Sequence, residues 1–257
     1  MKVTSFNING IRALMPRLVE YLKREQPEVV CLQELKCADE ALPIDDIEAA
    51  GYRGVWHGQK GFNGVAILGL GNLPLLRQTG LPDDPDDLHS RYIEADIYGL
   101  IVASIYLPNG NPIGTDKFTY KLRWMERLRA RAAELLAEER PVVLAGDFNV
   151  IPEDRDTFSK RAMANDALFQ PESQAAFRSL IHQGWTDSLR AIHPAEPRLF
   201  TFWDYQAGAL ARDAGFRIDH LLCSPQAADR LRDAGVHKWA RAEEKASDHA
   251  PTWIELV

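Results

Sequence analysis

Hydrophobic and polar positions along the chain follow the two-residue period of strands in some segments and helical spacing in others. Residues 3–8 alternate as a strand does, and the polar sequence that follows marks an exit into a loop. Residues 13–25 place apolar side chains at helical spacing until Pro27 ends the run. Residues 29–32 are short and apolar, as in a buried strand. The predicted order is strand, helix, strand.

The rest of the chain repeats this theme. Short segments rich in β-branched or aromatic residues predict strands at residues 64–69, 92–97, 100–106, 141–145, 200–203, 217–223 and 252–256. Helical spacing predicts helices at residues 117–139 and 173–183, and the stretch from 152 to 171 is rich in loop residues. Strands and helices recur in both halves, so we expect one α/β domain over residues 1–257, with packed sheets and helices outside.

Composition and charge narrow the functional classes. The net charge of -7 argues against a protein that coats nucleic acid through bulk positive charge, although a local basic cleft is compatible with it. Cys31, Cys37 and Cys223 are odd in number and lack CxxC spacing, which indicates neither a disulfide framework nor a zinc ribbon. No stretch reaches the roughly 20 apolar residues that span a bilayer. We therefore expect a cytoplasmic protein without a membrane segment.

Acidic, amide and histidine residues stand at the ends of several apolar segments. They are Glu34, Asp147, Asn149, Asp219, Asp248 and His249. Each one alone is explained by a turn, a helix cap or a structural salt bridge, but an ionised Asp219 inside an apolar run is costly unless it is paired or bound to a metal. Together they favour one site of hard oxygen donors, which suits Mg²⁺ or Mn²⁺ and phosphoryl transfer.

Several motifs in these segments resemble the exonuclease III and abasic-site endonuclease family, in the family's order and over almost the whole chain. They are Ser-Phe-Asn-Ile-Asn-Gly at 5–10, Pro-Glu-Val-Val-Cys-Leu-Gln-Glu-Leu-Lys at 27–36, Tyr-Leu-Pro-Asn-Gly at 106–110, Gly-Asp-Phe-Asn-Val at 146–150, Arg-Ile-Asp at 217–219 and Ser-Asp-His-Ala-Pro at 247–251. The resemblance implies a four-layer α/β sandwich, in which two packed mixed β-sheets are flanked by helices and the active site lies at one edge.

The resemblance also implies roles for individual residues. Glu34 is expected to be the principal metal ligand, with Asn9 and Asp248 close to the metal or its waters. Position 9 is Asn where some relatives carry Asp, so direct ligation there stays open. The expected catalytic residues are Asp147 for the water with Asn149 beside it, His249 at the phosphate held by Asp219, and Tyr106 and Asn7 as hydrogen-bond donors. Whether His249 or Asp147 handles the proton is not decided by the sequence.

Residues for substrate binding are expected around this centre. Phe202, Trp203 and Phe216 are candidates for the wall of a pocket that receives an extruded base-free sugar, and the alternative is that they are core aromatics. Basic residues on segments that lead to the site are candidates for phosphate contacts, the alternative being a solvated face. They are Lys36, Lys60, Arg91, Lys117, Lys121 and Arg123.

The function implied by the resemblance is hydrolysis of the phosphodiester on the 5′ side of abasic sites in duplex DNA. The same centre could carry 3′-5′ exonuclease and 3′-phosphatase activity, and the expected partner is double-stranded DNA with abasic sites or 3′ ends, bound by a monomer. One alternative is a metal-dependent phosphatase or phosphodiesterase of the same superfamily acting on a non-DNA substrate. A second is a regulator that binds DNA without cutting it.

Overall fold

A computed structural model describes residues 1–257 as two mixed six-stranded sheets. The first sheet has the order β11-β12-β1-β2-β4-β3 and consists of β1 (Lys2–Asn7), β2 (Val29–Gln33), β3 (Tyr52–His57), β4 (Val65–Leu70), β11 (Leu231–Val236) and β12 (Thr252–Leu256). The second has the order β5-β6-β7-β8-β10-β9 and consists of β5 (Leu75–Thr79), β6 (Tyr92–Ile97), β7 (Leu100–Tyr106), β8 (Val142–Asp147), β9 (Thr186–Asp187) and β10 (Asp219–Cys223). Only the β1–β2 and β7–β8 pairs are parallel.

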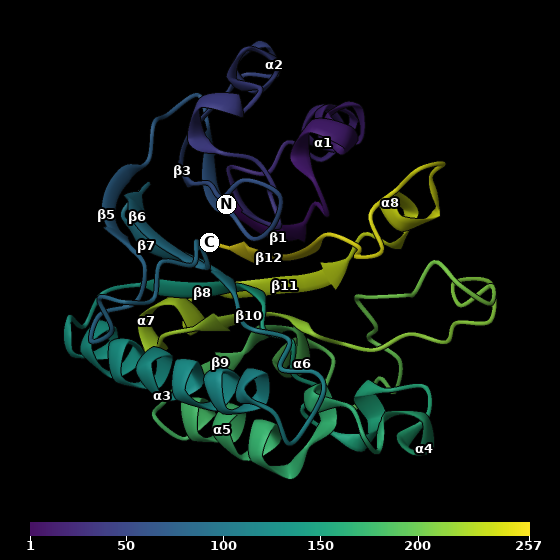
Figure 1. The fold of residues 1–257 in the computed structure, drawn as a ribbon. Coiled ribbons are helices and arrows are strands. Elements are labelled where there is room, and N and C mark those ends of the chain that lie inside the picture. The colour runs from purple at the N-terminus through teal and green to yellow at the C-terminus, as the bar shows by residue number, and fades with distance from the viewer.

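Helices cover the outer face of each sheet (Figure 1). The first sheet is covered by α1 (Ile11–Glu25), α2 (Ile44–Ala49) and α8 (Lys238–Ala242), and the second by α3 (Asp116–Ala137) and α5 (Pro171–Ile181). The remaining helices are short: α4 (Lys160–Met163), α6 (Ser188–Ile192), α7 (Pro225–Ala228) and the 3₁₀ turns η1 (Asp39–Ala41), η2 (Asp154–Asp156) and η3 (Ala167–Phe169). None of the helices combines the length and apolar character needed to cross a bilayer.

The cores follow from this layering. A cluster of 20 buried residues fills the space between the two sheets, with Val3 and Ile67 from the first sheet and Val102 and Leu221 from the second. One further cluster lies between the first sheet and its helices, and another lies between the second sheet and its helices. Apolar side chains on both faces of the central strands explain why these strands read as continuous hydrophobic runs. The predicted four-layer α/β sandwich is confirmed.

The predicted elements and the observed ones differ mainly at the edges. Residues 200–203 do not form a strand, because Phe202 makes only isolated bridges to Phe216 and His249. The prediction did not include α2, β3, β5 or β11. Three of these, β3, β5 and β11, are edge strands, and such strands leave side chains exposed on one or both faces, which weakens the hydrophobic pattern.

Candidate active site

Strand pairing in the second sheet brings three expected site residues together. Asp147 is the last residue of β8, and it lies opposite Asp219 in the antiparallel β10 and beside Tyr106 in the parallel β7. Gly146 makes this pairing possible, because a Cβ at that position would lie 2.0 Å from the carbonyl oxygen of Ile105. The register of three central strands therefore fixes the positions of these residues.

The first sheet contributes its residues at the carboxyl ends of two parallel strands. Asn7 pairs with Gln33, so Glu34 emerges directly beside Asn7 where both strands stop. Glu34 and Asn9 have left-handed backbone conformations, with φ of 55° and 49°, as does Asn149 after β8 with φ of 47°. Such conformations cost non-glycine residues free energy and cluster at functional sites. Here they turn polar side chains back toward the shared edge.

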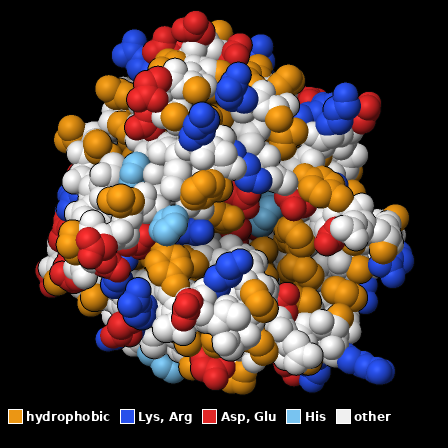
Figure 2. All heavy atoms as spheres, in the orientation of Figure 1, with side chains coloured by type: hydrophobic (Ala, Val, Ile, Leu, Met, Phe, Trp, Pro, Cys, Tyr) orange, Lys and Arg blue, Asp and Glu red, His pale blue; other side chains and the backbone are white.

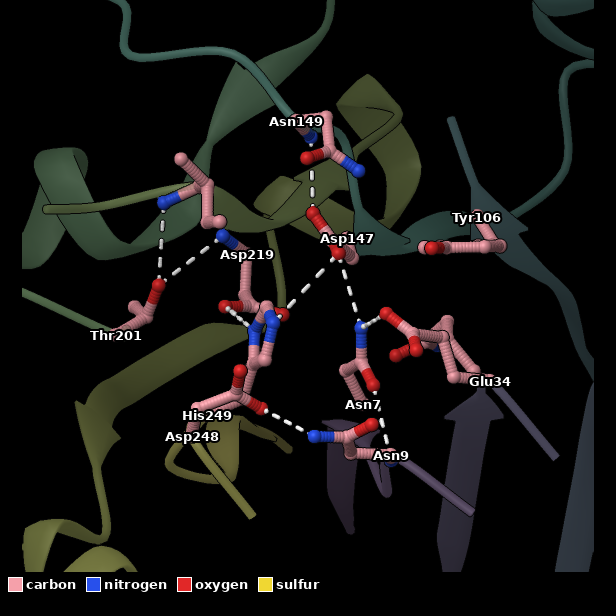
Figure 3. A network of polar contacts seen from close by, with 12 residues as sticks. Asn7, Asn9, Glu34, Tyr106, Asp147, Asn149, Thr201, Asp219, Asp248 and His249 are labelled. Carbon is pink, nitrogen blue, oxygen red and sulfur yellow. Dashed lines mark hydrogen bonds and ion pairs between the residues drawn. The ribbon is translucent and has the colours of Figure 1, made fainter. Parts of the chain in front are cut away.

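Asn7 links the two sheets at this edge. Its Nδ2 atom donates to Glu34 Oε1 at 2.8 Å and to Asp147 Oδ2 at 3.0 Å. The other carboxylate oxygen of Asp147 accepts the backbone N–H of Asn149 at 2.9 Å, as Figure 3 shows. Asp147 is almost fully buried, so these donors replace the water that a carboxylate would otherwise bind.

Both the backbone and the ring of His249 are held by hydrogen bonds. Its backbone N–H donates to Ser247 Oγ at 3.2 Å. Nδ1 donates to Asp219 Oδ2 at 2.8 Å, and Nε2 lies 3.8 Å from Asp147 Oδ2. Asp219 is fixed in turn by Thr201, whose Oγ1 accepts the backbone N–H groups of Ile218 and Asp219, each at 3.1 Å (Figure 3). Thr201 is a functional candidate that the sequence did not reveal.

Burial and mutual charge shift the pKa values of the central groups. Burial raises the pKa of Asp147 well above its usual range, and the carboxylates of Asp219 and Glu34 raise it further against the opposing charge of His249. For His249, burial lowers the pKa, but the Asp219 carboxylate outweighs this effect and the result is a pKa of about 10. Glu34 has a lowered pKa because hydrogen bonds from Asn7 and Lys36 outweigh its burial. The contact with Asp219 therefore favours the protonated form of the His249 ring.

The residues expected to hold a metal form a chain of contacts beside this centre. Asn9 Nδ2 donates to Asp248 Oδ1 at 3.0 Å, while the Lys36 ammonium donates to Asn9 Oδ1 and lies 2.7 Å from Glu34 Oε2. The ligand atoms of Glu34 lie within 4.8 Å of those of Asp147 and His249. Two carboxylates, those of Glu34 and Asp147, thus stand close together beside the ring of His249, and a cation would offset the repulsion between them.

A cavity of about 270 Å³ opens beside His249, and its lining includes the predicted wall residues Phe202 and Phe216. Phe202, Phe216, Ile218 and Leu168 form its apolar lining, and its polar lining includes Glu34, Asp147, Asp248 and His249. Figure 2 shows acidic and histidine side chains at the base of a central hollow, with hydrophobic side chains gathered along one side. The shape combines a polar reaction centre with an apolar wall.

Trp203 does not belong to that wall. Its side chain is fully buried in a small cluster with Phe200 and Ala209, and its indole N–H donates to Asp213. The expectation of a substrate contact is therefore wrong for Trp203, and the alternative of a core aromatic is correct. The direction of each side chain in this irregular segment is set by isolated bridges rather than by a regular strand, so the sequence could not assign it.

Some of the basic residues predicted to contact phosphates line a cavity near the site, and another is buried. Arg91 and Lys117 line a polar cavity of about 560 Å³ next to the site, and Arg91 lies over the ring of Tyr106 at 4.8 Å. Lys121 is fully buried, so it cannot reach DNA, and that expectation is wrong. Its ammonium donates to the carbonyl oxygens of Asn109 at 3.1 Å and Asn149 at 2.5 Å, which ties together two loops of the site.

Comparisons with known proteins agree with this geometry. Residues 4–249 match the Endonuclease/Exonuclease/phosphatase family, and an exodeoxyribonuclease III from Haemophilus influenzae is 36% identical over the full length of both chains. The chain belongs to the exonuclease III and abasic-site endonuclease branch of this family. An abasic-site endonuclease from Archaeoglobus fulgidus is 36% identical, with a TM-score of 0.95 over 100% of this chain and 99% of that one.

A second solved structure adds a different activity to the comparison. A 3′ phosphatase from Neisseria, bound to a product DNA hairpin, is 35% identical and superposes with a TM-score of 0.96 over 100% of this chain and 99% of that one. Family members with nearly the same backbone thus carry names for different DNA-end and lesion chemistries. In this exonuclease III family member, the fold alone therefore does not determine which of these chemistries is carried out.

Proposed function

We propose that this chain is a DNA-repair nuclease that hydrolyses the phosphodiester on the 5′ side of abasic sites in duplex DNA. The observation that carries the proposal is the cluster of Glu34, Asp147 and His249 beside a cavity with an apolar wall. A base-free sugar is apolar on its ring face and costs little to extrude, because no base pair has to be broken. Exonuclease and phosphatase action at 3′ ends would use the same centre.

In the proposed mechanism, Asp147 orients the attacking water and accepts its proton. Its pKa is raised toward neutrality, which brings it nearer to that of an effective general base at physiological pH. The water oxygen forms a bond to phosphorus while the bond to the 3′ oxygen of the preceding nucleotide breaks, and that oxygen takes up a proton from a solvent water. The products are a 3′ hydroxyl and a 5′ phosphate on the base-free sugar.

His249 has the complementary role of holding negative charge on the phosphate. Asp219 favours the protonated form of the His249 ring and leaves Nε2 on the side that faces Asp147, so a phosphate oxygen in the cavity beside them would receive a charge-assisted hydrogen bond from Nε2. Asn7 and Tyr106 lie on the opposite side of Asp147 as further donors (Figure 3). Burial and the carboxylates of Glu34 and Asp147 raise the pKa of Tyr106 far above its usual range, so the phenol keeps its proton.

The donor set fits Mg²⁺, with Mn²⁺ as an alternative. It consists of carboxylate and amide oxygens from Glu34, Asp248 and Asn9, and the cysteines are buried elsewhere in the core. We propose Glu34 as the principal ligand, because its half-buried carboxylate has a lowered pKa and its ligand atoms lie within 4.8 Å of those of Asp147 and His249. When bound, the metal would neutralise charge that develops on the phosphate.

The most informative experiment uses a duplex with one abasic site and a labelled strand. Purified protein is incubated with it in magnesium or in EDTA, alongside an intact duplex, a 3′-phosphorylated duplex and a soluble phosphomonoester. Nicking on the 5′ side of the lesion that occurs in magnesium but not in EDTA supports the proposal. If folded protein leaves the abasic duplex intact but hydrolyses the phosphomonoester, the substrate lies outside DNA; if it binds the duplex without cutting it, the chain is a regulator.

We further propose that the protein acts as a monomeric single catalytic domain in a reducing compartment such as the cytoplasm. The site is assembled from segments of one chain, from Asn7 to His249, which supports the monomer. All three cysteines are free and buried, which suits reducing conditions. Sedimentation of the protein alone and with the abasic duplex tests the stoichiometry.

A further inference from the structure

Three phenylalanine rings form a row that leads away from His249. The ring of Phe202 meets that of His249 edge-on, with centroids 5.0 Å apart, and stacks on Phe216 at 4.8 Å with 22° between the planes. Phe158 continues the row, with its centroid 6.5 Å from that of Phe216 and 24° between the planes. Phe158 is 42% exposed, so an aromatic ring with open surface stands at the outer end.

The backbone around Phe158 is held firmly against the segment that carries Phe216. The N–H of Phe158 donates to the carbonyl oxygen of Gly215 at 3.0 Å, and Thr157 bridges Phe216. Asp156 anchors the preceding turn, because its buried carboxylate accepts hydrogen bonds from Arg217 at 2.8 Å and 3.0 Å. An exposed aromatic ring on such a fixed backbone loses little conformational entropy when it binds a planar partner.

If the protein has the function proposed above, the planar partner of Phe158 is a nucleobase next to the lesion. Phe202 and Phe216 line the cavity beside His249, and Phe158 extends that aromatic surface beyond the cavity. In DNA with an abasic site, the base next to the lesion lacks a stacking neighbour on one face, so it is the base that is easiest to capture. Base stacking on an aromatic side chain is independent of sequence, as a repair enzyme requires.

We propose that Phe158 is a stacking platform for the nucleobase that flanks the abasic site on the cut strand. This inference rests on the proposed function, because it requires the base-free sugar to occupy the cavity lined by Phe202 and Phe216. It assigns to Phe158 a contact with the substrate that is separate from the reaction centre. Removal of the ring weakens binding of damaged DNA and leaves the chemical step unchanged.

Binding to a duplex with a stable abasic-site analogue, measured in EDTA, tests the proposal. The fluorescent base 2-aminopurine is placed beside the lesion on the cut strand or, in a second duplex, on the opposite strand. Wild-type protein is expected to quench the cut-strand probe. Phe158→Ala is expected to abolish the quenching and to raise Kd by about 5- to 30-fold, whereas Phe158→Tyr retains both within about twofold.

Two further variants distinguish stacking from the loss of a surface side chain. Tyr98→Ala removes a ring of matched exposure, 41%, from the turn at the far end of β7, and it is expected to leave Kd unchanged. Phe158→Leu keeps an apolar cover over Phe216 but no ring, so it is expected to behave like Phe158→Ala. Wild-type binding by Phe158→Leu, or quenching of the opposite-strand probe alone, overturns the proposal.

The same samples separate this inference from the function on which it rests. If wild-type protein nicks an authentic abasic duplex in magnesium but Phe158→Ala matches it in KM, kcat and quenching, only the role of Phe158 fails. If wild-type protein neither binds nor nicks the abasic duplex, the proposed function fails and the role of Phe158 fails with it. Thermal unfolding of each variant verifies that the fold is retained.

Discussion

Asp219 lies directly opposite Asp147 in the antiparallel pairing of β10 with β8. Two carboxylates on neighbouring strands would repel each other, and the ring of His249 reaches both, at 2.8 Å and 3.8 Å. The pairing therefore gives the two acids different surroundings. Asp219 accepts a hydrogen bond from the ring of His249, whereas Asp147 lines the cavity, where a substrate and water would lie.

Asp147→Asn is expected to slow nicking of an abasic duplex by about 10² to 10⁴-fold while DNA binding and thermal stability are retained. The amide keeps the size of the carboxylate but cannot accept a proton from water. Single-turnover nicking at saturating protein measures the chemical step. Asp154→Asn, at an exposed position, serves as the matched control and should behave as wild type. Near-normal turnover of Asp147→Asn would remove Asp147 from the proposed mechanism.

Thr201→Val is expected to destabilise the protein by about 2 kcal/mol, because two buried backbone N–H groups lose their acceptor. Asp219 should also become less well placed under His249, so kcat is expected to fall by about 10-fold with little change in the magnesium requirement. Thr201→Ser retains the hydroxyl and should restore both properties. Chemical denaturation and nicking kinetics measure the two effects, and equal kcat in all three proteins would contradict the positioning role.

The sequence predicts the strand-end residues of this site well, because a hydrophobic run marks where each strand stops. Asp147 and Glu34 follow such runs directly, and the structure places both at one edge. The sheet order that brings these ends together did not follow from the runs themselves; the likeness to a known family supplied it. That likeness, and the four-layer architecture it implies, are confirmed.

Other features depend on contacts that no local pattern encodes. Thr201 acts through its hydroxyl on backbone N–H groups 17 and 18 residues later in the chain, within a segment that lacks regular structure. Lys121 resembles the solvated lysines of its helix, yet it is buried because Gly110 and neighbouring loop residues close over it. Sequence periodicity describes one helix or strand at a time, so it cannot predict that a distant loop will bury a residue of that element.

Glu34→Gln is expected to raise the magnesium concentration for half-maximal activity by at least about 10-fold. The amide retains the hydrogen-bonding shape but removes the charge that faces Lys36 and, in the proposal, the metal. Nicking is titrated against magnesium for wild type, Glu34→Gln and the exposed control Glu40→Gln. An unchanged titration would assign the principal ligand to another residue, and Asp248→Asn would then be tested in the same way.

Lys121→Met is expected to change how stability depends on pH. Burial lowers the pKa of Lys121 from 10.5 to about 7, with Asp147 and Asp166 opposing the shift and Arg91 adding to it. Between pH 7 and 10.5 the unfolded wild-type chain therefore binds the proton that the folded chain lacks, so the free energy of unfolding rises as pH rises from 7 to 10.5 and falls as pH drops back to 7. Urea unfolding at several pH values should show wild type gaining on Lys121→Met toward alkaline pH. Lys117→Met, at an exposed lysine of the same helix, should show no such gain, and parallel curves for all three proteins would refute the lowered pKa of Lys121.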